Sequence, residues 1–216
     1  MFKASYIWCM GLILRFDWPE GHRIALWHCS ESIEELQSAL PFHQGDLDET
    51  KKLKHPKRAL EWYSSRAALR LGLEVTETVH YMANGKPYLS NAALSLSHCL
   101  PITGAMVHPL FGGMDIQVAD PKLAIIRPKF THDEEWTWMA DRDDELDCIT
   151  LLWSAKEALF KVYGEQLAFA DQIRIDPFTP GQLELSARVY RDGHGWIGHR
   201  LRCFSVLNHW VVAVVA

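Results

Sequence analysis

The sequence lacks a long hydrophobic run. A membrane helix needs about eighteen consecutive apolar residues, and no segment of the chain approaches that length. The apolar stretch from Ala4 to Leu14 is followed at once by Arg15 and Asp17, without a small-residue cleavage site. We therefore expect no membrane span and no signal peptide, and we expect a cytoplasmic protein.

Cysteine is scarce and has no pairing pattern. The chain has 5 cysteines in 216 residues, far apart and without a C-x-x-C pair. This pattern argues against a disulfide framework and against structural zinc. We expect each cysteine to be a reduced thiol that fills a small core position.

Common catalytic motifs are also missing, namely G-x-x-x-x-G-K-[ST], H-E-x-x-H and G-x-S-x-G. A match to G-x-G-x-x-G at Gly193, Gly195 and Gly198 lies between two predicted strands, and no helix follows it. We interpret it as a glycine-rich hairpin. The 11 histidines show no spacing typical of a metal site. Phosphate-loop, zinc-protease and serine-hydrolase classes are therefore excluded as interpretations of the sequence.

What is present is the composition of a folded chain, with 48% hydrophobic and 23% charged residues. Its length suits one large or two small domains. The formal net charge of -5 argues against bulk attraction to nucleic acid or to an anionic membrane. Any anion must therefore be bound locally.

The charges are segregated along the chain. Residues 51–70 carry seven cations against Glu61 alone, and residues 133–147 carry eight acids against Arg142 alone. We interpret the acidic run as solvated helix faces and loops. Within the basic run, helical spacing places a tryptophan and three arginines on one row, which predicts a cationic ridge: Arg58, Trp62, Arg66 and Arg70.

Local signals in the first half predict several elements. Ser32 to Glu35 forms a capping box before a short helix, and a longer helix is expected over 57–71, ended by Gly72. Asn84-Gly85 predicts a hairpin turn. Strands are expected over 23–29, 93–97, 103–107 and 113–118.

The second half begins with the best-defined helix of the chain, over 145–163. Alternating runs at 183–191, 201–207 and 210–215 then predict a closing antiparallel meander. We predict an α+β fold of two pseudo-symmetric lobes, residues 1–108 and 109–216, joined near 108–112. Each lobe is expected to pair an antiparallel sheet with a long helix.

Two segments of the second lobe place oxygen ligands near a lysine. Strand alternation puts Asp115 and Gln117 on one face, with Met114 and its alternate neighbours in the core. Helical spacing aligns Glu157 with Lys161. Each feature alone is more often structural, as a strand-end acid or a surface ion pair. Together they suit Mg²⁺, which takes one or two carboxylates plus substrate phosphates.

Two segments of the first lobe could meet phosphates. Alternation puts Ser95 and Ser97 on one face of a strand and His98 at its end, where a hydroxyl and an imidazole can donate. Lys86 directly follows the predicted turn. A capped strand end and a solvated turn lysine are the ordinary structural alternatives.

These segments resemble the 4'-phosphopantetheinyl transferase superfamily in order and approximate spacing. The resemblance rests on four stretches: Gly85 to Pro87, Ser95 to His98, Gly113 to Gln117, and the most specific, Trp153 to Lys161. It is closest to the larger, two-lobed, surfactin-synthetase-activating type, which is monomeric.

The resemblance implies transfer of the phosphopantetheine arm of coenzyme A to a serine of an apo acyl or peptidyl carrier protein. Adenosine 3',5'-bisphosphate is the other product. Asp115, Gln117 and Glu157 would hold Mg²⁺, or Mn²⁺ in its place, with Glu157 close enough to help deprotonate the serine. Lys161 would contact the diphosphate, and Asp115, Glu157 and Lys161 form the implied catalytic set. For the coenzyme, the resemblance further implies four ligands: Arg66 at the 3'-phosphate, Lys86 by the adenine, and Ser97 and His98 at phosphates.

The chain departs from the family pattern at two positions. Gln117 stands where the third metal position is usually Glu, and Ser95 replaces the commoner Asn. Gln117 leaves open a catalytically degenerate homologue that binds coenzyme A or a carrier protein without chemistry. A third interpretation, nucleic-acid binding by the basic run, fits the acidic chain poorly. The sequence does not identify the carrier protein.

Overall fold

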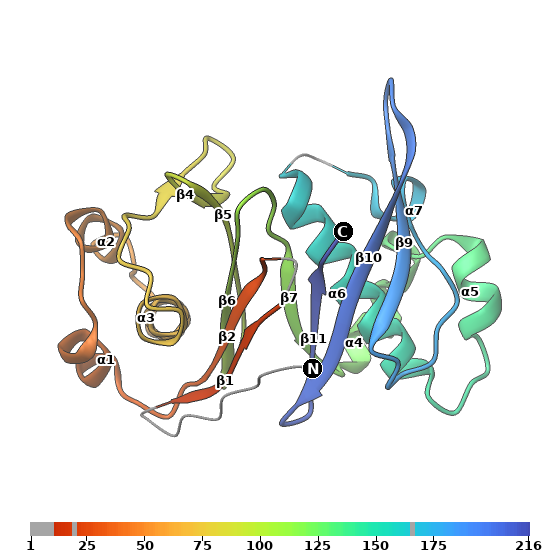
Figure 1. Cartoon of the computed structure of the whole chain (residues 1–216). Coiled ribbons are helices and arrows are strands. Elements are labelled where there is room, and N and C mark those ends of the chain that lie inside the picture. The colour runs from red at the N-terminus through yellow and green to blue at the C-terminus, as the bar shows by residue number, and fades with distance from the viewer. Residues whose placement is uncertain (1–10, 19–20, 165–166) are drawn as a thin grey trace. The chain divides into compact units, whose positions relative to one another are not determined.

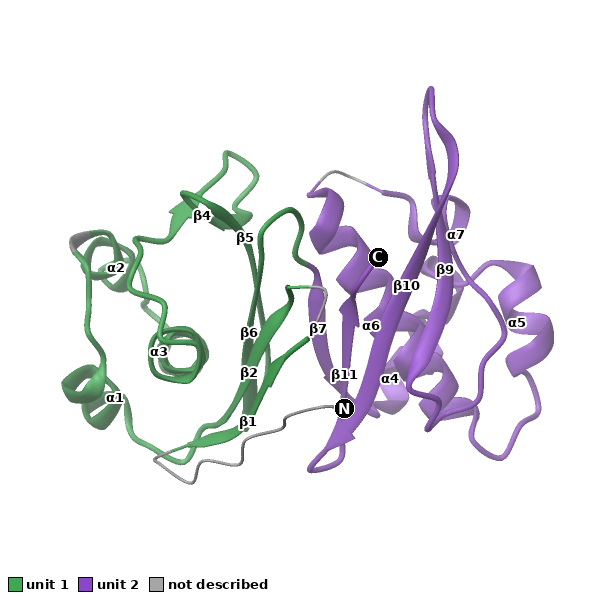
Figure 2. Ribbon diagram, in the orientation of Figure 1, with its two compact units in different colours: residues 1–112 green, residues 113–216 purple. Residues whose placement is uncertain are grey.

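A computed structural model describes residues 11–18, 21–164 and 167–216 of the chain. It separates into two compact units, residues 1–112 and 113–216 (Figure 2). Both units are mixed α+β, and each contains one antiparallel sheet. The α+β class is therefore confirmed, while the pseudo-symmetry of the two halves stays a prediction.

Unit 1 is built on a six-stranded sheet of order β1-β2-β6-β5-β4-β3, with three helices gathered on one of its faces (Figure 1). Its elements are β1 (Leu12–Asp17), β2 (Arg23–His28), α1 (Ile33–Ala39), α2 (Gln44–Thr50), α3 (Pro56–Ala67), a π-helical turn η1 (Ala68–Gly72), β3 (His80–Tyr81), β4 (Pro87–Leu89), β5 (Ala92–Cys99) and β6 (Ile102–His108).

The core of unit 1 lies between α3 with η1 and the central strands. Tyr63, Ala67 and Leu69 from the helix pack with Trp27 and Ala105 from the sheet. The capping box at Ser32 is confirmed, because its hydroxyl accepts from the Glu35 amide. Burial of this helical stripe holds the other face of α3 in a fixed position.

Unit 2 is built on a five-stranded sheet of order β7-β11-β10-β9-β8. Its elements are β7 (Met114–Val118), α4 (Pro121–Ile126), a 3₁₀ turn η2 (Arg127–Lys129), α5 (Asp133–Met139), α6 (Glu145–Tyr163), α7 (Phe169–Gln172), β8 (Ile173–Ile175), β9 (Glu184–Arg191), β10 (Gly195–Val206) and β11 (His209–Val214). The helix predicted over 145–163 is confirmed as α6. The glycine-rich hairpin is confirmed as the turn between β9 and β10.

The long helix α6 packs on β7 and β11, and Gly164 ends it in the left-handed conformation with φ 65°. Ile149, Leu152 and Leu159 are almost completely buried. This packing sets the position of every α6 side chain that faces β7.

Three expectations were wrong. Val118, one of the alternate neighbours of Met114 that alternation places in the core, is 37% exposed because it lies at the end of β7. The acidic run is not only solvated: it contains α5, and Glu135 there is 2% exposed. The helix expected over 57–71 changes to π geometry at Ala68, where the Leu73 amide donates to the Ala68 carbonyl.

Several short elements were not predicted from the sequence, namely β1, α2, α4 and β8. The four described cysteines are free thiols, while Cys9 and residues 4–10 of the apolar N-terminal stretch lie outside the described residues. Among the helices of the described ranges, none combines the length and the apolarity that crossing a bilayer would require.

Candidate functional site

The polar centre of unit 2 is the carboxylate of Asp115 on β7, whose two oxygens are held by α6. Lys161 Nζ donates to Oδ1 at 2.8 Å, and Ser154 Oγ donates to Oδ2 at 3.0 Å. Lys161 also donates to the carbonyl oxygen of Met114 at 2.9 Å. The strand and the helix therefore bring together Asp115 and Lys161, as the sequence predicts.

Close packing at the start of β7 makes these bonds possible. A Cβ at Gly113 would lie 2.1 Å from the carbonyl oxygen of Ala158, well inside contact distance. Only glycine therefore lets this strand approach the helix backbone so closely. Asp115, two residues later on the same strand, is consequently within reach of side chains on α6.

Glu157 lies on the same helix and is partly buried. Burial raises the pKa of its carboxyl, the negative charge of Asp115 raises it further, and Lys161 partly offsets both. The two acids therefore interact unfavourably when both are ionised, and a bound cation would relieve this repulsion.

The donors present fit a hard divalent cation held with substrate phosphates. Asp115 and Glu157 supply carboxylate oxygens, and the amide of Gln117 on the same strand can supply a neutral oxygen. Within the described ranges, no group of three or more His, Cys, Asp or Glu side chains could hold a metal ion. Mg²⁺ commonly takes one or two carboxylates and fills its other positions with waters and substrate phosphates, which is the kind of donor set that Asp115, Glu157 and Gln117 offer.

A second lysine on α6 has a different role. Lys156 is fully buried, and its Nζ donates to Glu135 Oε2 at 2.6 Å and to three backbone carbonyls, those of Phe130, Phe169 and Ile173. Burial lowers the pKa of Lys156 to about 8 against the opposing effect of Glu135. This cage ties α6 to α5, α7 and β8, and no local signal in the sequence predicts it.

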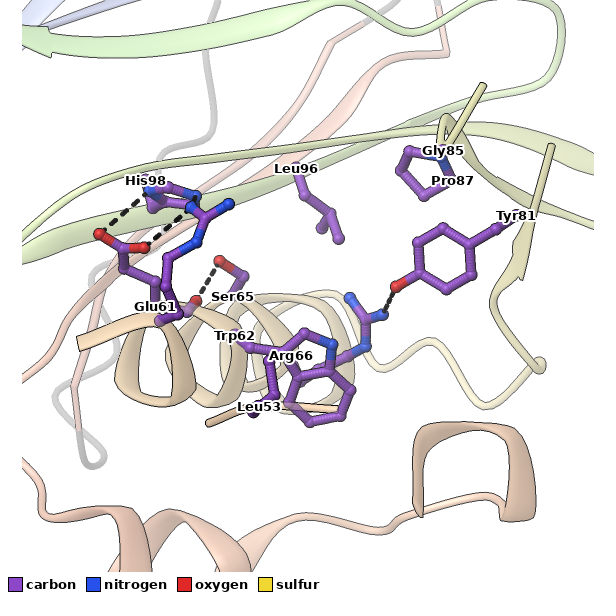
Figure 3. A pocket seen from close by; sticks show the side chains of 11 residues that line it. Leu53, Glu61, Trp62, Ser65, Arg66, Tyr81, Gly85, Pro87, Leu96 and His98 are labelled. Atoms are coloured by element: carbon purple, nitrogen blue, oxygen red, sulfur yellow. Dashed lines mark hydrogen bonds and ion pairs between the residues drawn. The ribbon is translucent and has the colours of Figure 1, made fainter. Parts of the chain in front are cut away.

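Unit 1 contains a cavity of about 340 Å³ between α3 and the β3–β5 side of its sheet (Figure 3). Two of the predicted coenzyme ligands, Arg66 and His98, line it together, and so do the neighbours of a third, Gly85 and Pro87 beside Lys86. The complete lining is Leu53, Arg58, Glu61, Trp62, Ser65, Arg66, Tyr81, Gly85, Pro87, Leu96 and His98.

The guanidinium groups of the expected cationic ridge are largely neutralised by the protein itself. Arg66 and Arg70 are 1% and 4% exposed, and both bind the carboxylate of Asp46 on α2, at 3.2 and 2.8 Å. Burial alone would raise the pKa of Asp46, but Arg70 and Arg66 outweigh it and leave the pKa below its ordinary value. At Arg66 and Arg70 the predicted row of cations is therefore buried and paired with an acid of the protein.

The other end of the cavity is organised by Glu61. Its carboxylate lies 3.1 Å from Arg58 Nη1 and 3.7 Å from Nδ1 of His98 (Figure 3). Arg58 Nη1 is also 3.5 Å from Nε2 of His98. A nearly buried acid thus aligns a guanidinium and an imidazole at one wall of the cavity, and the sequence analysis did not single out Glu61.

Arg66 forms the opposite wall with two aromatic side chains. Its guanidinium lies 4.6 Å from the ring centroid of Trp62 and donates to the hydroxyl of Tyr81 (Figure 3). The indole Nε1 of Trp62 is buried and has no hydrogen-bond partner among the described residues. The cavity is therefore rich in donors.

The remaining predicted ligands lie apart from this wall. Burial lowers the pKa of Lys86, which is half-buried after the turn that Gly85 makes with φ 83°. Ser97 is 4% exposed and alternates with His98 on β5, so it faces the opposite side of the sheet from the cavity. Lys51, at the start of the basic run, is exposed and pairs with Asp48.

Part of the chain matches the model of a known protein family. The model of the 4'-phosphopantetheinyl transferase superfamily matches residues 113–215, which is all of unit 2 except its last residue. The matched stretch contains Asp115, Gln117, Glu157 and Lys161, while the cavity of unit 1 lies outside it. None of the curated proteins matches the chain.

Proposed function

We propose that this protein is a 4'-phosphopantetheinyl transferase of the larger, two-lobed type, acting as a cytoplasmic monomer. It would transfer the phosphopantetheine group of coenzyme A to a serine of an apo acyl or peptidyl carrier protein. The observation that carries the proposal is the cluster of Asp115, Lys161 and Glu157, which lies within the stretch that the family model matches.

In the proposed reaction the serine Oγ attacks the β-phosphorus of coenzyme A. An Oγ–P bond forms, and the bond from phosphorus to the bridging oxygen breaks. Adenosine 3',5'-bisphosphate leaves, and Glu157 takes the serine proton directly or through a water. Lys161 stabilises the negative charge on the diphosphate, and Asp115 keeps its ammonium in place.

Asp115, Glu157 and Gln117 are the residues proposed to hold Mg²⁺, or Mn²⁺ in its place. Bound there, the metal would act as a Lewis acid on the phosphoryl oxygens. Two carboxylates are enough because Mg²⁺ commonly keeps waters and takes further ligands from substrate phosphates.

The cavity of unit 1 is proposed to bind the phosphates of the nucleotide part of coenzyme A. Arg58, Arg66 and His98 line it, and guanidinium groups suit phosphate because they donate in a planar fork. Lys86 is the candidate for the adenine side. Ser97, which the resemblance implies as a phosphate ligand, faces the other side of the sheet and is not proposed as a ligand in this cavity.

A surface of unit 2 formed by α4 and η2 suits an acidic carrier protein. The segment 121–129, formed by α4 and η2, begins four residues after Gln117 and contains no acid. Lys122 and Lys129 are exposed, and Ile125 is 78% exposed. A cationic surface with an exposed apolar side chain fits the acidic region that carrier domains tend to have around the modified serine.

The test is intact-mass spectrometry of a panel of apo carrier proteins incubated with the protein, coenzyme A and Mg²⁺, with a parallel EDTA sample. A mass gain of one phosphopantetheine group that EDTA prevents is the expected result. No gain on any carrier would overturn the proposal.

A second candidate, binding without chemistry, is favoured by Gln117. This neutral residue stands where the family pattern usually has a third acid. If coenzyme A binds but no carrier gains mass, and Gln117→Glu restores transfer, the protein is a degenerate binding homologue.

A further inference from the structure

We infer that Ser154 is a positioning residue, whose hydroxyl orients the carboxylate of Asp115 for a divalent cation. The inference rests on the proposed function, because it concerns the same metal site. Ser154 is not one of the residues that the sequence pattern marks as catalytic or coenzyme-binding. Ser154 is distinguished by the acceptor of its hydroxyl proton, which is the side chain of Asp115.

Hydroxyls inside helices usually bond to the carbonyl one turn earlier. Buried examples among the described residues are Thr150 on α6, which donates to Leu146, and Ser64 and Ser65 on α3, which donate to Leu60 and Glu61, each at 2.7 Å. Ser38 on α1 and Thr137 on α5 bond in the same way at 2.9 Å. Ser154 lies one turn after Thr150 and is fully buried. Its hydroxyl instead donates to Asp115, 39 residues away in the sequence.

The two bonds to Asp115 come from one rigid element. Ser154 and Lys161 are seven residues apart, so they lie on the same face of α6, two turns from each other. Ser154 holds Oδ2 and Lys161 holds Oδ1. Because each oxygen has its own donor, the plane of the carboxylate is fixed relative to the helix that also carries Glu157.

An ionised carboxylate has about four acceptor positions in all, so it can accept hydrogen bonds and also give an oxygen to a cation. If Ser154 is replaced by a residue without a donor, the carboxylate can rotate about its last bond and leave the orientation that it shares with Glu157. Loss of such an outer partner typically weakens metal binding by about tenfold to a hundredfold.

The experiment measures Mn²⁺ binding by electron paramagnetic resonance of free Mn²⁺, with and without saturating coenzyme A. The wild-type protein is compared with Ser154→Ala, Ser154→Thr and the control Thr150→Ala, which removes a buried hydroxyl of the same helix that bonds locally. We expect Ser154→Ala to weaken Mn²⁺ binding by about tenfold or more. Ser154→Thr, which keeps the hydroxyl, should restore most of the affinity, and Thr150→Ala should leave it unchanged.

A purely structural role predicts a different pattern, in which Ser154→Ala and Thr150→Ala lower the thermal midpoint alike and leave Mn²⁺ affinity alone. That result would overturn the inference, as would wild-type protein that binds no Mn²⁺. If Ser154→Ala does not fold, Ser154→Cys replaces it, since a thiol keeps nearly the same volume but is a weak donor. Ser154→Cys is then expected to show the same loss.

The outcome is separable from that of the proposed function. Protein that transfers phosphopantetheine but shows equal Mn²⁺ affinity in Ser154→Ala contradicts the inference alone. Protein that binds Mn²⁺ in a Ser154-dependent way but modifies no carrier contradicts the transferase proposal and leaves the positioning role in place.

Discussion

The cavity of unit 1 and the acidic centre of unit 2 contain candidate ligands of opposite charge. In unit 1 the candidate anion ligands Arg66 and Arg58 are cations, and each is paired with an acid of the protein, Asp46 or Glu61. In unit 2 the candidate metal ligand Asp115 is an anion, and it is paired with Lys161. Each region thus holds its functional charge in place with a partner of the opposite sign.

The pairs differ in burial, and this difference has consequences. Asp46, Arg66 and Arg70 are all at most 4% exposed, so their removal would leave bare charges in a poorly solvated site. The side chain of Lys161 is 26% exposed, and so it can exchange one anionic partner for another at lower cost. Unit 1 pairing should therefore govern stability, while unit 2 pairing should govern chemistry.

The largest expected effect tests the unit 2 side of this contrast. Glu157→Gln keeps the shape of the side chain but removes a base and a metal ligand. The rate of transfer should fall by about 10²-fold to 10⁴-fold. The affinity for adenosine 3',5'-bisphosphate should stay close to that of the wild type. Single-turnover mass spectrometry and calorimetry measure the two quantities, and near-normal turnover would contradict the assignment.

The unit 1 side is tested by stability. Asp46→Asn leaves two buried guanidinium groups without their anion, and we expect a loss of about 3–5 kcal/mol in the free energy of unfolding. Urea unfolding measures it. Asp48→Asn is the matched control, because that acid pairs with Lys51 at the surface and should cost about 0–1 kcal/mol.

The same pair predicts a pH dependence. Because the pKa of Asp46 is lowered in the folded protein, its ion pairs contribute fully above the ordinary aspartate pKa of about 4. That contribution is lost as the pH falls through the lower folded value. Below pH 4 the urea midpoint of wild type should fall more steeply than that of Asp46→Asn; parallel curves would show that Asp46 does not carry this effect.

A smaller effect is expected within the cavity. His98→Ala removes one donor from the wall that Glu61 aligns, and affinity for adenosine 3',5'-bisphosphate should fall by about tenfold to a hundredfold, the value of a hydrogen bond to a charged group. His80→Ala on β3 is the control, since His80 is exposed and does not line the cavity. Equal losses in both variants would argue against a phosphate site here.

The smallest effect concerns the partner surface. Lys122→Glu and Lys129→Glu should each raise the KM for an acidic carrier protein several-fold at low salt, with less effect at high salt, and leave the KM for coenzyme A unchanged. Steady-state kinetics at two ionic strengths measure this. Lys51→Glu, at the surface of unit 1, is the control, and an equal rise there would remove the special role of segment 121–129.

Periodic patterns were sufficient to predict part of this molecule. Alternation placed Asp115 on β7, and helical spacing placed Glu157 and Lys161 on α6, because both signals are local. The partners that hold these groups were not predictable in the same way. Ser154 with Asp115, Lys156 with Glu135, and Arg66 with Asp46 are 39, 21 and 20 residues apart, so only the packed fold brings them together.

The errors have the same origin. Helical spacing predicts a row of arginines, but nothing near Arg70 in the sequence indicates that Asp46 will bury and neutralise it. The acidic run around Glu135 is typical of a solvated segment. Glu135 is nevertheless buried, because Lys156 on another helix forms an ion pair with it. Short elements such as α2 and α4 carry too few residues for a clear period.

The π-helical turn after α3 contains an extra residue. With the Leu73 amide bonded to Ala68 rather than to the residue after it, the turn from Ala68 to Gly72 holds one more residue than a regular α-helical turn. Deleting a single residue there would rewind the turn and rotate everything beyond it by about 100°. If the deleted residue precedes Arg70, the Arg70 side chain would leave Asp46, so the length of this turn as well as its side chains keeps the buried ion pair of unit 1 in register.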